Sequence, residues 1–294
     1  MYRSLEEAVR DATARRATLA QVALAAEAED QGRTVEAIRA ALGRALEVMR
    51  GATGRGLAGD LRSASGLVGG DAAKLVAGAG AGAVVGGVFR DVLARALAVQ
   101  EVNAAMGVIV AAPTAGGAGV LPAVLTGLAH ARGLSDDALV DALATAGLIG
   151  AVVAERASLS GAEGGCQAET GAAAGMAAGA AAEMLGGTPA QAGHAVALAM
   201  QGTLGLVCDP LGGLVELPCV FRNATGSAIA LAAVEMALAG ITFAIPVDEV
   251  IDVMGEIGRG MDVRYRETAG GGLAATPTGR RLARERLVQI KRGS

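Results

Sequence analysis

Alanine and glycine, the two smallest residues, make up about 38% of this 294-residue chain, with 68 alanines and 45 glycines. Aromatic residues are only 2% of the chain, and there is no tryptophan. Because there are too few aromatic rings to fill the protein interior, the secondary-structure elements must pack at close range. Because alanine favours helices and is depleted in strands, the composition predicts an all-α fold, a compact helical bundle with buried Ala/Gly-rich helices.

Composition also excludes several classes of protein. A hydrophobic content of 52% with a net charge of -4 is not that of a disordered chain. The negative charge and the scarcity of aromatic rings give no basis for binding nucleic acid. The three cysteines do not suit a secreted disulfide scaffold, and residues 1–16 are charged and amphipathic rather than signal-like. We therefore expect a cytoplasmic protein with no nucleic-acid partner.

One uncharged stretch is long enough to cross a membrane. Residues 102–131 contain no Asp, Glu, Lys or Arg over 30 positions. Pro113, Pro122 and a glycine cluster at 116–119 should interrupt a helix there, and unpaired backbone is not tolerated in lipid. We expect no membrane association.

Capping residues and apolar periodicity predict helices along most of the chain, and 108–110 is the best, although short, candidate for a strand. No linker is rich enough to divide the chain, so a single domain is expected. The predicted helices span 4–12, 34–51, 74–100, 135–153, 188–200, 224–240 and 247–257.

Each cysteine lies at a break marked by glycine or proline. Cys166 follows two glycines and leads into an alanine-rich run, which places it near a helix N-terminus, where the helix dipole favours a thiolate. Cys208 precedes Asp209 and a proline, and Cys219 follows Pro218. The ten residues between these two cysteines contain a Gly-Gly pair, so the chain can turn back and bring both sulfurs to one place.

The spacing alone leaves several alternatives open. Three unrelated buried thiols fit it, and so does a structural zinc site that lacks its fourth ligand. A third alternative is an iron–sulfur cluster with one iron not bound by the protein. Such an iron would act as a Lewis acid toward a hydroxyl group.

Five segments narrow these alternatives. They are 69–75 (GGDAAKL), 103–122 (NAAMGVIVAAPTAGGAGVLP), 160–169 (SGAEGGCQAE), 204–223 (LGLVCDPLGGLVELPCVFRN) and 266–279 (RETAGGGLAATPTG). Their sequence, order and spacing closely resemble the α chain of bacterial iron–sulfur L-serine dehydratases. The resemblance divides the chain into looser N-terminal helices over 1–66, a motif-bearing core over 67–279 and a basic C-terminal helix over 280–294.

The resemblance implies a lyase that converts L-serine into pyruvate and ammonia without pyridoxal phosphate. It assigns Cys166, Cys208 and Cys219 as ligands of a 4Fe–4S cluster whose fourth iron is free for the substrate. Glycines after Thr114 would let backbone N–H groups approach a carboxylate closely. The expected substrate-binding residues are Thr114, Ala115, Gly116, Gly117, Ser160 and Asn223.

The chain also departs from the family pattern. Residues 201–203 stand where some branches carry a histidine, and no cysteine follows Cys219. The small domain of the family, which carries a Ser/His motif, has no counterpart here. We therefore expect the two-chain type, in which a separate β chain supplies the base, and the catalytic residue stays unassigned. Two alternatives remain open, a related lyase that releases sulfide from L-cysteine and a non-catalytic helical subunit with buried thiols.

Overall fold

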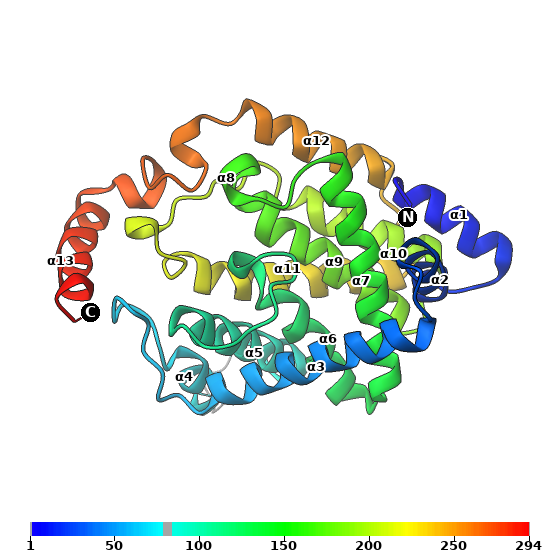
Figure 1. The fold of residues 1–294 in the computed structure, drawn as a ribbon, viewed down its shortest axis with the longest axis horizontal. Helices are drawn as coiled ribbons and strands as arrows, with labels where there is room; N and C mark the ends of the chain where they lie inside the picture. Colours follow the sequence, from blue (N-terminus) through cyan, green and yellow to red (C-terminus); the bar gives the residue numbers. More distant parts are fainter. Residues whose placement is uncertain (1, 79–83, 294) are drawn as a thin grey trace.

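Helix α9 (Ala172–Met184) lies at the centre of the fold and is made almost entirely of alanine and glycine. Its residues from Ala172 to Ala182 are buried. It packs against α10 (Pro189–Gln201), α7 (Asp136–Arg156) and α11 (Cys219–Leu238), which surround it in Figure 1. The small residues of α9 therefore let the neighbouring helices pack closely around it.

The small residues of α9 are required by these contacts. A Cβ atom added at Gly179 would lie 2.6 Å from Cδ1 of Ile149 and 2.7 Å from Cγ2 of Val196. A Cβ atom at Gly175 would lie 2.8 Å from Cγ of Met200. All three distances are shorter than van der Waals contact, so helices α7 and α10 could not pack this closely on a larger side chain.

The computed structural model describes residues 2–78 and 84–293, and over these residues it contains thirteen α-helices and no β-strand. The predicted all-α class is confirmed, whereas the predicted strand at 108–110 is wrong because those residues form an irregular loop. The remaining α-helices are α1 (Leu5–Arg15), α2 (Leu19–Gln31), α3 (Val35–Leu57), α4 (Asp71–Ala77), α5 (Gly87–Ala104), α6 (Val120–Arg132), α8 (Gly161–Gly164), α12 (Val247–Gly260) and α13 (Pro277–Gly293).

The predicted helix starts are confirmed at four capping residues. Their side chains accept hydrogen bonds from the third backbone N–H of α1, α3, α7 and α10, which satisfies otherwise unpaired donors. These capping residues are Ser4, Thr34, Ser135 and Thr188.

Two helix predictions need correction, and one helix was missed. The helix after Thr34 does not stop at Gly51 but continues to Leu57, because glycine inside a helix weakens it without ending it. The single helix predicted over 74–100 is instead α4 and α5, and part of the connection, 79–83, lies outside the described residues. Helix α2 was not predicted, although Thr18 and Gln21 form a capping box at its start.

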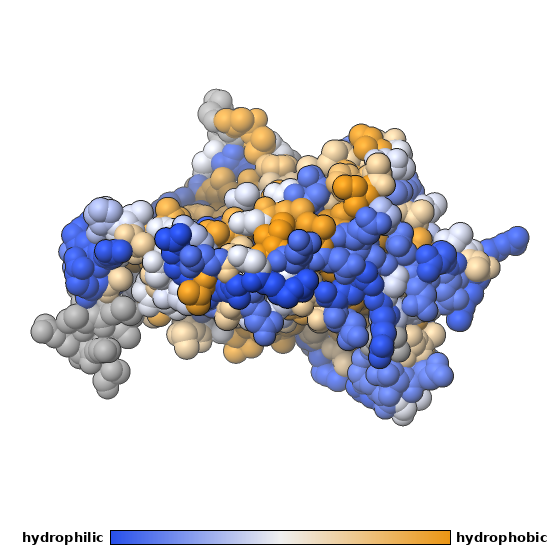
Figure 2. All heavy atoms as spheres, turned by 90° about the horizontal axis from the view of Figure 1, so that it is seen from above, coloured by the Kyte–Doolittle hydropathy of each residue, from blue (hydrophilic) through white to orange (hydrophobic). Residues whose placement is uncertain are grey.

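Within the described residues, α7 is the one helix long and apolar enough to cross a membrane. In its most apolar part, 67% of α7 is buried, and it packs against α9 and α2 among others, as a core helix does. The face in Figure 2 carries hydrophilic residues across most of its width, interrupted by apolar patches. One hydrophobic cluster extends from Leu5 to Met254, and the boundaries predicted at 66 and 279 stay predictions.

Candidate metal centre and substrate loop

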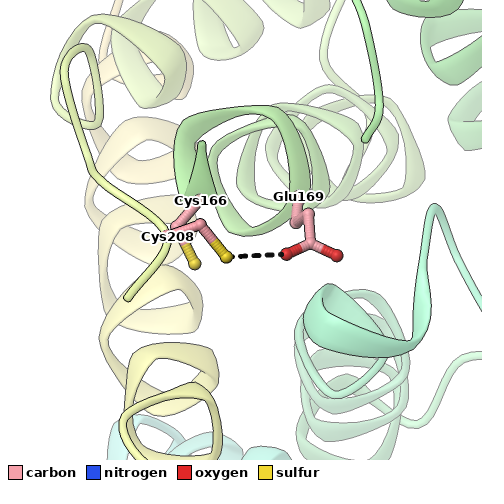
Figure 3. Close-up of side chains that lie close together, drawn as sticks. All are labelled: Cys166, Glu169 and Cys208. Carbon is pink, nitrogen blue, oxygen red and sulfur yellow. Dashed lines mark hydrogen bonds between the residues drawn. The ribbon is translucent and has the colours of Figure 1, made fainter. Parts of the chain in front are cut away.

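Two of the three cysteines converge on a glutamate. The Sγ atoms of Cys166 and Cys208 and a carboxylate oxygen of Glu169 all lie within 4.8 Å of one another, and all three residues are buried. Figure 3 shows the sulfur atoms and the carboxylate directed toward the same point. Cys166 and Glu169 share one helical turn before α9, whereas Cys208 comes from the loop after α10.

The loop that carries Cys208 is fixed on both sides of the residue. The Cys208 N–H donates to the carbonyl of Tyr265 at 2.8 Å, and the Cys208 carbonyl accepts from the N–H of Glu267 at 2.9 Å. Cys208 and Arg266 thus form an isolated parallel bridge. The segment around residue 266, one of the five motifs, therefore holds a thiol in position.

Cys219 is the first residue of α11 and is buried. Its sulfur is not among the donor atoms that lie within 4.8 Å of one another. Burial raises the pKa of the Cys219 thiol, and the charges of Cys166 and Glu169 raise it further. The structure thus brings together the donor atoms of Cys166, Cys208 and Glu169 and leaves Cys219 outside this group.

The two closest thiols have opposite pKa shifts. The hydrogen bond from Cys208 lowers the pKa of Cys166, and the nearby Arg222 guanidinium lowers it further, although burial opposes both effects. The same hydrogen bond and burial raise the pKa of Cys208.

Arg222 connects the segments that carry Cys208 and Cys219. Its Nη1 donates to the carbonyl of Val207 at 2.8 Å, and its Nη2 lies 2.8 Å from Oδ1 of Asp209, so it contacts the residues on both sides of Cys208. Arg222 itself is one helical turn after Cys219. A single cation thus ties two thiol-bearing segments together and partly offsets their negative charge.

Glu169 lies between two glycines that allow its close approach. A Cβ atom at Gly116 would lie 2.7 Å from its Oε1, and one at Gly161 would lie 2.6 Å from its Oε2. Oε1 accepts a hydrogen bond from the hydroxyl of Thr114 at 2.7 Å, and Cys208 Sγ lies 3.8 Å from Oε2. Burial is the largest effect on Glu169 and raises its pKa.

The loop after Thr114 is fixed by side-chain amides. Gln100 Nε2 and Asn103 Nδ2 donate to the carbonyl of Ala115 at 2.9 Å and 3.1 Å. Among the residues that the structure describes, the N–H groups of Ala115 and Gly116 have no acceptor. The loop therefore presents two backbone donors that an anionic ligand can use.

The side-chain amide of Asn223 is bonded to three backbone groups. It is fully buried, and its Oδ1 accepts from the N–H of Gly119 at 2.9 Å. Its Nδ2 donates to the carbonyls of Gly116 at 2.6 Å and Cys219 at 2.9 Å. With its amide occupied, Asn223 connects the loop to the start of α11, a positioning role that sequence analysis did not foresee.

Ser160 is the residue before α8, and its carbonyl accepts from the N–H groups of Glu163 and Gly164. Its hydroxyl has no hydrogen-bond partner in the described part of the chain. Since Gly161 follows it and borders Glu169, this hydroxyl remains a candidate for contact with a ligand.

Sequence analysis did not single out Glu169 and Arg222. Each lies three residues after a cysteine, Cys166 or Cys219, and residues three apart share a face of a helix. That spacing is a signal that could have identified both residues.

Comparison with known proteins places these features in context. A family model described as "Serine dehydratase alpha chain" matches residues 14–274. A "Probable L-serine dehydratase, alpha chain" of Bacillus subtilis (strain 168) is 48% identical over 97% of this chain and 95% of its own length. An "L-serine dehydratase, alpha chain" of Peptoniphilus asaccharolyticus is 43% identical over 70% of each chain.

Longer relatives match over a smaller share of their length. "L-serine dehydratase 1" of Escherichia coli (strain K12) is 47% identical over 61% of this chain, and the matched part is 40% of that relative. The shared part of these two proteins is therefore one portion of a larger polypeptide in the relative.

Proposed function

Because the chain belongs to the serine dehydratase alpha chain family, we propose that it is the α subunit of an L-serine dehydratase. The reaction removes water from L-serine, and hydrolysis of the resulting imine then gives pyruvate and ammonia. The single observation that best supports this function is the convergence of buried thiols and Glu169 beside the loop after Thr114.

The donor set fits the 4Fe–4S cluster that the family resemblance implies. Cys166, Cys208 and Cys219 are free, buried thiols, and thiolates are the usual ligands of iron–sulfur clusters. The Arg222 guanidinium adds a positive charge that offsets negative charge at the thiolates. We assign the three cysteines as the protein ligands, and the bound cluster would supply an iron without a protein ligand as a Lewis acid for the substrate hydroxyl.

The loop after Thr114 is proposed to bind the substrate carboxylate. The free N–H groups of Ala115 and Gly116 can donate to it, and Gly117 keeps the loop small against the helix that carries Glu169. The Ser160 hydroxyl is a further candidate donor, whereas Asn223 holds the loop in place. These residues orient the substrate, and the geometry assigns none of them as the base.

A separate β chain is proposed to complete the site. The relatives named as α chains imply a partner by their name, and the longer Escherichia coli relative contains additional sequence in one polypeptide. We propose that this partner supplies the base that removes the α-proton. The cysteine usage favours a cytoplasmic enzyme. The resemblance to the serine dehydratase family implies that the enzyme needs no pyridoxal phosphate.

The function can be tested on the complex of both chains, assembled without air in the presence of iron and sulfide. Pyruvate, ammonia and sulfide are measured with L-serine and with L-cysteine as substrates. The proposal predicts a higher kcat/KM for L-serine, with pyruvate and ammonia formed in equal amounts. A preference for L-cysteine with release of sulfide would support the alternative lyase, and no turnover of either substrate would support a non-catalytic subunit.

A further inference from the structure

The cluster of Cys166, Glu169 and Cys208 has the composition of a site for a single metal ion. We propose that the chain without its iron–sulfur cluster binds one divalent ion of the zinc type through Sγ of Cys166, Sγ of Cys208 and Oε2 of Glu169, and that Cys219 is not a ligand of this ion. The inference rests on these side chains and not on the reaction that the chain catalyses.

The distances are close to those that such an ion needs. Zinc binds sulfur at about 2.3 Å and carboxylate oxygen at about 2.0–2.2 Å, so its tetrahedral ligands lie roughly 3.5–3.8 Å apart. Cys208 Sγ is already 3.8 Å from Oε2 of Glu169, and all three donor atoms lie within 4.8 Å of one another. Small side-chain rotations therefore suffice to place one ion between them.

Neighbouring residues hold the donors in this arrangement. Thr114 occupies Oε1 of Glu169 and leaves Oε2 on the side of Cys208. The backbone of Cys208 is bonded on both sides to the segment around residue 266. Such outer contacts orient ligands and strengthen metal binding.

Charge and burial favour an ion at the same point. Two sulfur donors and one carboxylate lie close together in the interior. Arg222 supplies one positive charge nearby. When the ion binds, two thiol protons pass to the solvent and the metal charge replaces them. Zinc binds sites of this type more tightly than ferrous iron does, so zinc would compete with iron for the empty chain.

Cobalt(II) is a suitable spectroscopic probe for this site. The full-length chain is freed of metal with a chelator under anaerobic, reducing conditions and is titrated with cobalt(II). We expect one ion per chain, with visible bands of tetrahedral cobalt and near-ultraviolet charge transfer from sulfur, and loss of both signals when zinc is added. Cys219→Ser should keep these signals, whereas Cys208→Ser should lose them.

Glu169→Gln separates the carboxylate from the thiols. The amide can still accept from Thr114, so the local fold should persist, but affinity for cobalt should fall at least about tenfold. Far-ultraviolet circular dichroism verifies that each variant is folded. An unchanged affinity in Glu169→Gln, an equal loss in Cys219→Ser and Cys208→Ser, or no stoichiometric binding by the native chain would each overturn the proposal.

Competition with iron gives a second readout. Chain loaded with zinc should take up little iron and sulfide during reconstitution, and removal of zinc should restore the uptake. If the native chain binds cobalt but never assembles a cluster, the proposed iron–sulfur function fails while this inference stands. If it assembles a cluster but binds no cobalt when empty, only this inference fails.

Discussion

The hydroxyl of Thr114 donates a 2.7 Å hydrogen bond to Oε1 of Glu169, which joins two segments 55 residues apart in the sequence. One segment is the proposed carboxylate-binding loop, and the other begins with Cys166. A single hydrogen bond therefore couples the position of the substrate loop to that of the thiols.

Removal of this bond should reduce activity more than stability. We expect Thr114→Val to lower kcat/KM for L-serine at least about tenfold, because the loop loses a donor and Glu169 loses its partner. Thr114→Ser keeps the hydroxyl and should stay within about threefold of the native value. Steady-state pyruvate assays on the complex measure both, and equal losses in the two variants would contradict a role for the hydroxyl.

Glycine at position 161 should be required by the site. In Gly161→Ala the new Cβ would lie 2.6 Å from Oε2 of Glu169 and 3.2 Å from Cys208 Sγ, so at least one of these groups must move. We expect loss of most iron binding and activity, measured by iron content and pyruvate formation. Gly43→Ala in α3 is the matched control because its Cβ meets nothing within 4 Å, and it should keep activity and gain about 0.5–1 kcal/mol of stability.

Local signals in the sequence predicted much of the helical structure, because a cap such as Thr188 with Gln191 is a short-range interaction. Residues that depend on tertiary packing were less accessible. The valine-rich segment at 108–110 suggested a strand, but in the structure no neighbouring strand pairs with it among the described residues. The glycines in α3 suggested that this helix ends early, but it continues and packs closely on α5. A Cβ atom at Gly56 would lie 2.1 Å from the carbonyl oxygen of Ala98 in α5.

Some residues of the candidate site could likewise be predicted from local sequence, whereas others could not. The cysteines were found because thiols are rare and lie in motifs, whereas Glu169 resembles any surface glutamate until the fold buries it between Gly116 and Gly161. Asn223 was expected to meet the substrate because it is polar and lies in a motif. Only the structure shows that its amide is bonded to Gly116, Gly119 and Cys219.

Asn223 should therefore contribute to stability as well as to the site. We expect Asn223→Ala to lower the free energy of unfolding by about 2–4 kcal/mol, because it removes three buried hydrogen bonds and leaves their backbone partners unpaired. Thr225→Ala, two residues further on the exposed side of α11, should change it by less than about 0.5 kcal/mol. Urea unfolding of the reduced chain without metal measures both. Similar values for the two variants would contradict the positioning role.

The raised pKa of the buried Glu101 carboxyl should make the stability of the protein depend on pH. Its Oε1 accepts from the N–H groups of Asp71 and Ala72, yet burial is the larger effect and raises its pKa above the ordinary 4.5. The folded state therefore binds the proton more tightly than the unfolded state. The stabilising contribution is complete below the unfolded pKa and is lost as the pH rises through the folded pKa.

Glu101→Gln keeps an oxygen acceptor and removes this ionisation. The free energy of unfolding of Glu101→Gln minus that of the native chain should increase as the pH rises from about 4 to 7, so the variant becomes relatively more stable. Urea unfolding of both proteins at each pH measures this difference. A difference between the two proteins that stays constant over this range would contradict the raised pKa.

The central claim is that Cys166, Cys208 and Cys219 together hold an iron–sulfur cluster. The direct measurement is the iron and acid-labile sulfide content of chain reconstituted without air, compared with Cys208→Ser and Cys219→Ser prepared in parallel. We predict about four irons and four sulfides per native chain, with broad visible absorbance, and loss of both in each variant. Retention of the full content by either variant, or no iron and sulfide in the native chain, would contradict the assignment.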